Sequence, residues 1–161
     1  MLLVEADLRT PSLATRLGLP PVPGLAEVLA GQAEAAAAVR PGGAAGPDVL
    51  PAGTRPPDPA ELLGARQMAD LVAGLRPSYD QVVLDVPPVL PVTDAVVCAA
   101  LADGVLVVVR WGRTRRPDAV EAVGMLGQAG APVLGGVLVG RRRTRAELRR
   151  RSAAIPRADA G

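Results

Sequence analysis

Three carboxylates stand at or just beyond the ends of two short apolar segments. Glu5 and Asp7 follow the run LLV at 2–4, and Asp85 ends the run that starts at Val82. Runs of this kind are typical of strands buried on both faces of a parallel sheet. Open α/β folds hold their ligands at the carboxyl edge of such a sheet, where we expect these acids to lie. Carboxylate oxygens suit Mg²⁺, which takes one or two protein carboxylates and keeps several waters.

The same acids could take part in phosphoryl transfer. In that reaction one acid anchors the metal, and another orients or deprotonates the attacking hydroxyl. Because side chains alternate along an extended strand, Glu5 and Asp7 should project to the same side. A single acid at a strand end is a weak signal, since turns and caps use the same residue types. The function therefore depends on the elements that position these acids.

The chain of 161 residues is long enough for one domain with its own core, and its 18 glycines and 17 prolines divide it into short segments. Strands are expected at 2–4, 49–51, 82–84, 105–109 and 133–139. Helices are expected near 26–30 and at 60–75, 93–101, 118–128 and 143–151. Apolar strands that alternate with helices predict an α/β fold with a parallel sheet in three layers.

Charge and composition restrict the partners. The net charge of +2 combines −6 over residues 1–109 with +8 over residues 110–161, which indicates an acidic site region and a basic tail with an acidic partner. The tail, 141–161, is either a solvated chain end or a contact for an anionic membrane surface or acidic protein. With one Trp and one Tyr in the chain, nucleic-acid binding is not expected. No stretch suits a membrane helix or a signal peptide, so a cytoplasmic location is expected.

Five segments in order resemble the bacterial tyrosine kinases of capsule and exopolysaccharide synthesis. They read LLVEADLRTPS, LGLPPVPGLAEVLAG, DVLPAGTRPPDPAELLG, SYDQVVLDVPPVLPVTDA and DGVLVVVRWGRTR. That family belongs to the deviant-Walker P-loop ATPases, with the chromosome-partitioning and division-site-placing ATPases, and the resemblance covers residues 1–139. It implies a three-layer P-loop NTPase-like parallel sheet with helices on both faces, lacking the first strand–P-loop–helix unit. The partial kinase domain would span 1–140, followed by the Arg-rich flexible tail at 141–161.

The resemblance also implies a role for individual residues. The segment from Leu2 to Arg9 matches the family's second Walker motif, with Glu5 in place of its first Asp and Asp7 at its second. Asp85, followed by two prolines, matches the Walker B Asp. The implied catalytic residues are Asp7 and Glu5, the Mg²⁺ ligands are Asp85 and Asp7, and the cofactor-binding residues are Arg9 and Asp85. The implied cofactors are ATP and Mg²⁺, and Glu5 is one methylene longer than the residue it replaces.

Two departures from the family pattern stand out. The Walker A loop, which ends in Gly-Lys-Ser or Gly-Lys-Thr and grips the phosphates, is expected upstream of Met1, and the chain has no lysine to replace it. The tail also lacks the family's tyrosines, and the sole tyrosine, Tyr79, precedes the Walker B-like strand, where a structural role is expected. Omission of a Walker A strand from the sheet would leave open strand edges. Runs such as 105–109 would then need a neighbour, a partner chain or a rearranged sheet.

Three functions remain open. The first is an ATP-dependent protein-tyrosine kinase that regulates capsular or exopolysaccharide synthesis, present as a truncated form that is inactive alone. The second is a catalytically inactive interaction module that binds a polysaccharide chain-length regulator or a complete kinase subunit. The third is a partitioning-type ATPase remnant. The expected partners are a transmembrane polysaccharide co-polymerase and further copies of the chain or a complete kinase subunit. Any membrane contact would be indirect or through the Arg-rich tail, at the inner face of the plasma membrane.

Overall fold

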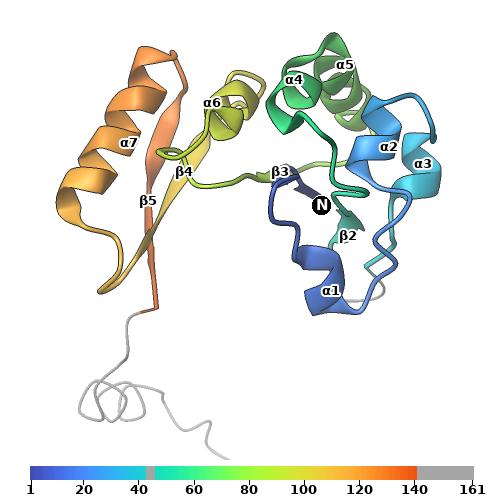
Figure 1. Ribbon diagram of the computed structural model, residues 1–161, viewed down its shortest axis with the longest axis horizontal. Coiled ribbons are helices and arrows are strands. Elements are labelled where there is room, and N and C mark those ends of the chain that lie inside the picture. Colours follow the sequence, from blue (N-terminus) through green and yellow to red (C-terminus); the bar gives the residue numbers. More distant parts are fainter. Residues whose placement is uncertain (43–45, 141–161) are drawn as a thin grey trace, which may run out of the picture.

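The computed structural model describes residues 1–42 and 46–140, which form short strands and helices in alternation (Figure 1). The strands are Leu2–Glu5 (β1), Asp48–Leu50 (β2), Val82–Asp85 (β3), Val105–Arg110 (β4) and Val133–Val139 (β5). The helices are Leu13–Leu17 (α1), Leu25–Leu29 (α2), Ala35–Ala38 (α3), Pro59–Gly64 (α4), Arg66–Leu75 (α5), Asp94–Ala99 (α6) and Arg116–Gln128 (α7). The helix expected at 143–151 and the tail at 141–161 lie outside the described residues.

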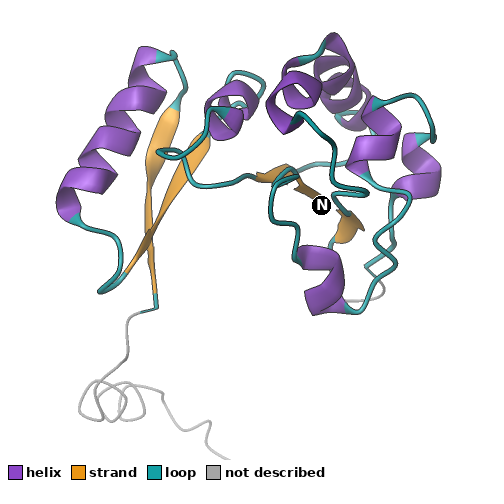
Figure 2. Ribbon diagram, viewed as in Figure 1, coloured by secondary structure: helices purple, strands orange, loops and turns teal. Residues whose placement is uncertain are grey.

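All strand pairings between these elements are parallel, as the sequence predicts for an α/β fold. They form two sheets, one in the order β2-β1-β3 and the other with β4 beside β5 (Figure 2). Figure 1 places α7 with β4 and β5 at one end of the molecule and α1 to α5 with the first sheet at the other, with α6 between them. Within the part of the chain that the structure describes, β3 and β4 are therefore both edge strands, as expected for a sheet that lacks an inner strand.

The larger core lies against the first sheet. Leu2 and Val4 of β1 are fully buried and pack with apolar residues of α2, α4, α5 and α6, including Leu63 and Met68. A smaller core joins Leu126 of α7 to β4 and β5. Both cores consist almost entirely of Leu, Val, Ala and Met because the chain has no Phe. The first sheet is thus anchored by far more buried apolar surface than the second.

One expected helix is two. The segment 60–75 was predicted as a single helix from its apolar spacing, but α4 ends at Gly64 and α5 begins at Arg66, because Ala65 has the extended dihedral angles φ −69° and ψ 154°. Glycine has a low helix propensity, and the break lets α4 pack on α6 while α5 covers the core. Periodicity cannot distinguish one amphipathic helix from two that share a buried face.

The start of α4 follows local chemistry that the sequence contains. The Asp58 side chain accepts a hydrogen bond of 3.1 Å from the Glu61 N–H, and Pro59 occupies the first turn, where no amide partner is lost. α1 and α3 were not predicted because one-turn helices carry too few residues for a periodic pattern. No helix in the described ranges is long and apolar enough to cross a bilayer.

Candidate functional site

The three predicted acids meet at the carboxyl edge of the first sheet. Glu5 and Asp85 are register partners at the ends of β1 and β3. Just past this pair, the Ala6 N–H donates to the Asp85 carbonyl at 2.8 Å, and Asp7 follows immediately. The fold therefore brings Glu5, Asp7 and Asp85 together from positions 80 residues apart in the chain, as the strand pattern predicted.

Glu5 is engaged on both of its oxygens. Only 2% of the residue is exposed, Oε1 accepts the N–H groups of Ser12 at 2.5 Å and Leu13 at 2.6 Å, and Oε2 accepts that of Ala52 at 3.2 Å. The carboxylate thereby ties the end of β1 to the start of α1 and to the loop after β2. A buried carboxylate held by three backbone donors has a structural task, which the longer Glu side chain can perform.

Asp7 organises the loop that follows β1. Its Oδ1 accepts the N–H groups of Arg9 at 3.2 Å and Thr10 at 2.9 Å, and its Oδ2 accepts the Thr10 hydroxyl at 2.8 Å. Asp side chains commonly stabilise turns in this way. Asp7 is nevertheless partly exposed, so its oxygens remain open to solvent and to a ligand.

Arg9 forms an ion pair that the sequence alone did not reveal. Its Nε and Nη2 donate to Asp94 Oδ2 at 2.7 Å and Oδ1 at 2.9 Å, and Asp94, in the first turn of α6, is fully buried. The hydrogen bonds that Arg9 donates to Asp94 raise the pKa of Arg9. The sequence predicted a helix over 93–101, which contains Asp94, but gave this residue no role. The signal that could have found it is its place directly ahead of the apolar run AVVCAA, since a carboxylate buried there requires a partner.

Asp85 differs from its neighbours because its carboxylate carries an electrostatic cost. The side chain reaches solvent, but partial burial, followed by the negative charges of Glu5 and Asp7, raises its pKa. A divalent cation beside Asp85 would neutralise that repulsion. Asp85 with Asp7 therefore suits Mg²⁺, which takes one or two carboxylates and water. In the described part of the chain, no group of three or more His, Cys, Asp or Glu is arranged as a metal site.

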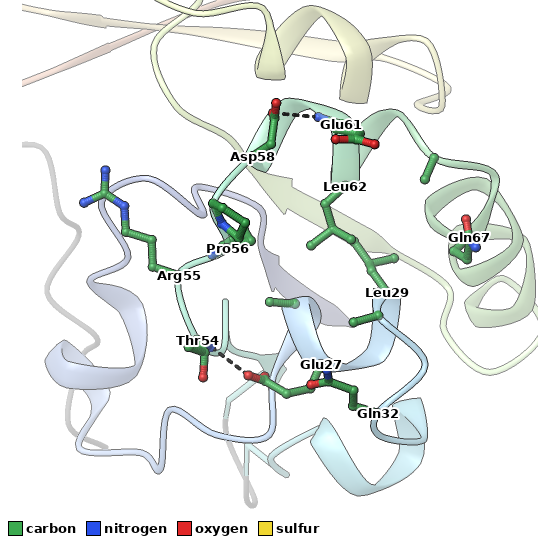
Figure 3. Close-up of a pocket in the computed structure, with 14 residues that line it drawn as sticks. Glu27, Leu29, Gln32, Thr54, Arg55, Pro56, Asp58, Glu61, Leu62 and Gln67 are labelled. Atoms are coloured by element: carbon green, nitrogen blue, oxygen red, sulfur yellow. Dashed lines mark hydrogen bonds between the residues drawn. The ribbon is translucent and has the colours of Figure 1, made fainter.

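A pocket of about 460 Å³ lies beside this edge but contains none of the three acids (Figure 3). It is formed by α2, the connector 54–58, α4 and the start of α5. Glu27 reaches back into the loops here and accepts the N–H groups of Gly24 at 2.7 Å and Thr54 at 3.0 Å. These hydrogen bonds outweigh the effect of burial, so the pKa of Glu27 is lowered. Its role is to join the segments PGLAE and PAGT.

The sole tyrosine has a structural environment. The Tyr79 hydroxyl donates to Asp48 Oδ2 at 2.9 Å, and its ring packs against the larger core. Burial, and then the hydrogen bond to Asp48, raises the pKa of Tyr79. The hydroxyl is thus engaged in joining β2 to the start of β3, in agreement with the role expected from the sequence.

Curated relatives of this chain are kinases and polysaccharide-synthesis proteins. The chain is 35% identical over 142 residues to the tyrosine-protein kinase YwqD of Bacillus subtilis, a match that covers 88% of this chain and 60% of that protein. It is 34% identical over 138 residues to the tyrosine-protein kinase wzc of Salmonella typhimurium, a match that covers 86% of this chain and 19% of that protein. It is 40% identical over 116 residues to the succinoglycan biosynthesis transport protein ExoP of Rhizobium meliloti, a match that covers 70% of this chain and 15% of that protein. No protein-family model matches.

Solved structures show the same fold. The VpsO kinase domain superposes with a TM-score of 0.83 at 35% identity, covering 88% of this chain and 70% of that one. The kinase domain of the Escherichia coli tyrosine kinase ETK superposes with a TM-score of 0.84 at 34% identity, covering 89% of this chain and 57% of that one. The septum site-determining protein MinD of Pyrococcus horikoshii matches in fold with a TM-score of 0.69 at 24% identity. The chain spans less than two thirds of the length of the curated relatives above.

Proposed function

The chain belongs to the bacterial tyrosine kinases, within the P-loop NTPase fold, and from this premise we propose that it carries the metal-and-base half of an ATP-dependent tyrosine kinase site. The other half, a Gly-Lys-Ser/Thr loop that grips the phosphates, would come from a segment outside these 161 residues. The observation that supports the proposal is the pairing of Glu5 with Asp85 at the sheet edge, with Asp7 beside them.

Each acid has a distinct task in this proposal. Asp85 and Asp7 would hold Mg²⁺, which supplies charge neutralisation at the phosphates when bound. Asp7 would accept the proton of a tyrosine hydroxyl. At the same time the tyrosine oxygen would form a bond to the γ-phosphorus of ATP, and the bond between that phosphorus and the ADP oxygen would break. Glu5 would hold the loop that carries Asp7, because both of its oxygens already accept backbone N–H groups. Arg9 as a nucleotide contact stays a prediction, since Asp94 engages its guanidinium.

Calorimetric titration with ATP and Mg²⁺ tests the proposal on two proteins. The first is the full chain, for which we expect no saturable binding at millimolar nucleotide. The second is the same chain fused behind the Walker A segment of the Bacillus subtilis relative, for which we expect dissociation constants of roughly 1–100 µM. Failure of the fused protein to bind, although folded, would count against the kinase site.

Substitutions assign the acids within the fused protein. Asp85→Asn and Asp7→Asn should each weaken Mg²⁺-dependent binding about tenfold or more, because each removes a charged ligand. The matched control is Asp80→Asn, an exposed acid just before β3 that should leave binding unchanged. Equal effects of all three substitutions would point to general electrostatics instead of a defined site.

A second candidate function is a catalytically inactive interaction module. It is favoured by the absence of any lysine and by the engagement of Glu5 in backbone hydrogen bonds. It predicts no ATP binding by either protein in the same titration. The partners we propose for both functions are a transmembrane polysaccharide co-polymerase and kinase subunits or further copies of the chain, at the cytoplasmic side of the membrane. The partitioning-type remnant has less support, since the similar proteins are named as a tyrosine-protein kinase and a succinoglycan biosynthesis transport protein.

A further inference from the structure

The turn that joins β4 to α7 is closed by its own hydrogen bonds. The N–H groups of Arg113 and Thr114 both donate to the Arg110 carbonyl, at 3.1 and 2.9 Å, and the Thr114 hydroxyl accepts the Arg110 N–H at 3.0 Å. The Trp111 N–H donates to the Val139 carbonyl at 2.9 Å, which ties the turn to the end of β5. The backbone of the turn is therefore held in place from both strands.

The side chain of Trp111 lies outside the protein core. It is 60% exposed and belongs to neither of the two described cores. Beside it, at the end of β5, Leu138 and Val139 are 51% and 38% exposed. Water solvates large apolar side chains poorly. A turn that is ordered and still presents such a ring to solvent is typical of a contact surface.

Four arginines flank this tryptophan in the sequence. They are Arg110, Arg113, Arg115 and Arg116, and all are exposed. Arg115 donates two hydrogen bonds to Asp118, at 3.0 and 2.8 Å, so a carboxylate already matches its charge. Among the described residues, no ion pair involves the other three. The turn therefore presents three positive charges together with one apolar ring.

The turn lies at the end of the molecule opposite the first sheet. Figure 1 shows it at the outer end of the β4–β5 unit, while α1 to α5 and the first sheet form the other end. The charges follow a similar division, because residues 1–109 carry a net charge of −6 and residues 110–161 one of +8. An anionic surface would attract the second part and repel the first, so it would bind the molecule in one orientation.

The chemistry of the turn favours a lipid bilayer with anionic headgroups over other polyanions. Tryptophan is enriched where proteins meet the membrane interface, because its ring is apolar and its indole N–H can stay hydrated. Arginines near an anionic bilayer add attraction without partners at fixed positions, since lipids move laterally. An acidic protein would need carboxylates at matched positions, as Asp118 supplies for Arg115. A single ring gives nucleic-acid bases little to stack on.

We propose that the turn 110–116, with the exposed end of β5, is a peripheral contact site for an anionic lipid bilayer. Trp111 would enter the interface between headgroups and acyl chains, and the three arginines without a carboxylate partner would lie at the level of the phosphates. The two parts act together, because a small apolar insertion or a few charges alone bind a membrane only weakly. The inference goes beyond the proposed function, which assigns no role to this turn, and it holds without nucleotide.

The single tryptophan of the chain makes this contact directly observable. The full chain, without nucleotide, is titrated with vesicles of phosphatidylglycerol and phosphatidylcholine in equal amounts while its fluorescence emission is recorded. We expect the emission of Trp111 to shift to shorter wavelength and to be quenched by brominated acyl chains, because the ring leaves water. Vesicles of phosphatidylcholine alone should bind at least about tenfold more weakly, and added salt should weaken binding to the anionic vesicles.

Substitutions separate the turn from the overall charge, with co-sedimentation on the anionic vesicles as the measurement. Arg113→Gln with Arg116→Gln should weaken binding about tenfold or more, and Trp111→Ala about fivefold. Arg113→Lys with Arg116→Lys should retain binding, because it retains the charge. Arg16→Gln with Arg66→Gln is the control, since it removes the same charge from exposed positions on α1 and α5 and should change the affinity by less than about twofold. Circular dichroism verifies that each variant folds.

Four results would overturn the inference. The first is no saturable binding of the folded chain to the anionic vesicles up to millimolar lipid. The second is binding that leaves the emission of Trp111 and the affinity of the turn variants unchanged, which would assign the contact to the tail at 141–161. The third is an equal loss in the control, which would mean that net charge alone decides. The fourth is an emission shift with polyglutamate but none with vesicles, which would assign the turn to an acidic protein.

Discussion

Glu5 and Asp85 are register partners, yet their carboxylates do different things. Glu5 is buried and accepts three backbone N–H groups, while Asp85 reaches solvent beside two other negative charges. The Glu5 side chain extends far enough to reach the Ser12 and Leu13 amides at the start of α1. Glu5 therefore holds the loop that carries Asp7, and the chemistry that we propose falls to Asp7 and Asp85.

Replacement of Glu5 by Ala should destabilise the protein. It leaves three backbone N–H groups without an acceptor in a buried region, and each such group costs about 1–3 kcal/mol. With partial rehydration, we expect a loss of about 3–5 kcal/mol in the free energy of unfolding, measured by urea denaturation. Glu121→Ala on the exposed side of α7 is the control, with an expected change within about 0.5 kcal/mol. Similar losses for both would contradict this role.

Asp85 should make the stability of the protein depend on pH. The pKa of Asp85 in the folded protein is raised above 3.8, its ordinary value, which applies to the unfolded chain. At a pH between these two pKa values, the folded protein holds a proton that the unfolded chain has released. The free energy of unfolding therefore falls as pH rises through that window and stays lower above it. Without metal, Asp85→Asn should raise the melting temperature at pH 7, and this gain should vanish below pH 3.8.

Added Mg²⁺ should act against the difference in melting temperature between Asp85→Asn and the unsubstituted chain. A cation beside Asp85 removes the repulsion, so Mg²⁺ should raise the melting temperature of the unsubstituted chain more than that of Asp85→Asn. Asp80→Asn serves as the control in the pH series and in the comparison with Mg²⁺. If Asp85→Asn raised the melting temperature equally at every pH, or if Mg²⁺ raised it equally in Asp85→Asn and the unsubstituted chain, Asp85 would not be the acid whose charge is repelled.

Among the elements, the loop after β1 and the start of α6 are joined by Arg9 and Asp94. This pair fixes the loop that bears Asp7 relative to the segment that follows Asp85, and the Arg9 N–H also donates to Asp7 at 3.2 Å. Asp94 is fully buried and bonded on both oxygens. By contrast, the pair of Arg76 with Asp103 is exposed on both sides.

A double-mutant cycle should separate these two ion pairs. Arg9→Ala, Asp94→Ala and the double variant should give a coupling energy clearly above that of Arg76 with Asp103, because only the first pair is bidentate with a buried partner. For the exposed pair we expect about 0.2–1 kcal/mol. The measurement is the free energy of unfolding for each variant. Equal coupling in the two cycles would show that burial of Asp94 adds nothing.

At the level of the whole molecule, the two sheets differ in how well they are held. Among the described residues, the first has three strands and a large buried core, whereas the second has two strands, one small core and an exposed apolar face. Two-stranded units are marginal without further packing. The second sheet is therefore the less well packed part of the described fold.

Native-state hydrogen exchange should resolve the two sheets. Amides of β1 should exchange through the largest opening free energies, and amides of β4 that are bonded to β5 should exchange at least about tenfold faster. The strand pairs β1–β3 and β4–β5 offer a like-for-like comparison because both are parallel. Equal protection in both pairs would mean that the fold opens as one cooperative unit.

The sequence by itself determined the α/β class, the five strands and the meeting of Glu5, Asp7 and Asp85. Apolar runs that end in acids at parallel strand ends leave little freedom of placement. Only the tertiary structure decided what the acids contact. Backbone amides brought from α1 and β2 occupy Glu5, and Asp94 engages Arg9 from 85 residues away. Such contacts depend on distances between segments that no local pattern encodes. For the same reason the break at Ala65 emerges only once the elements are packed.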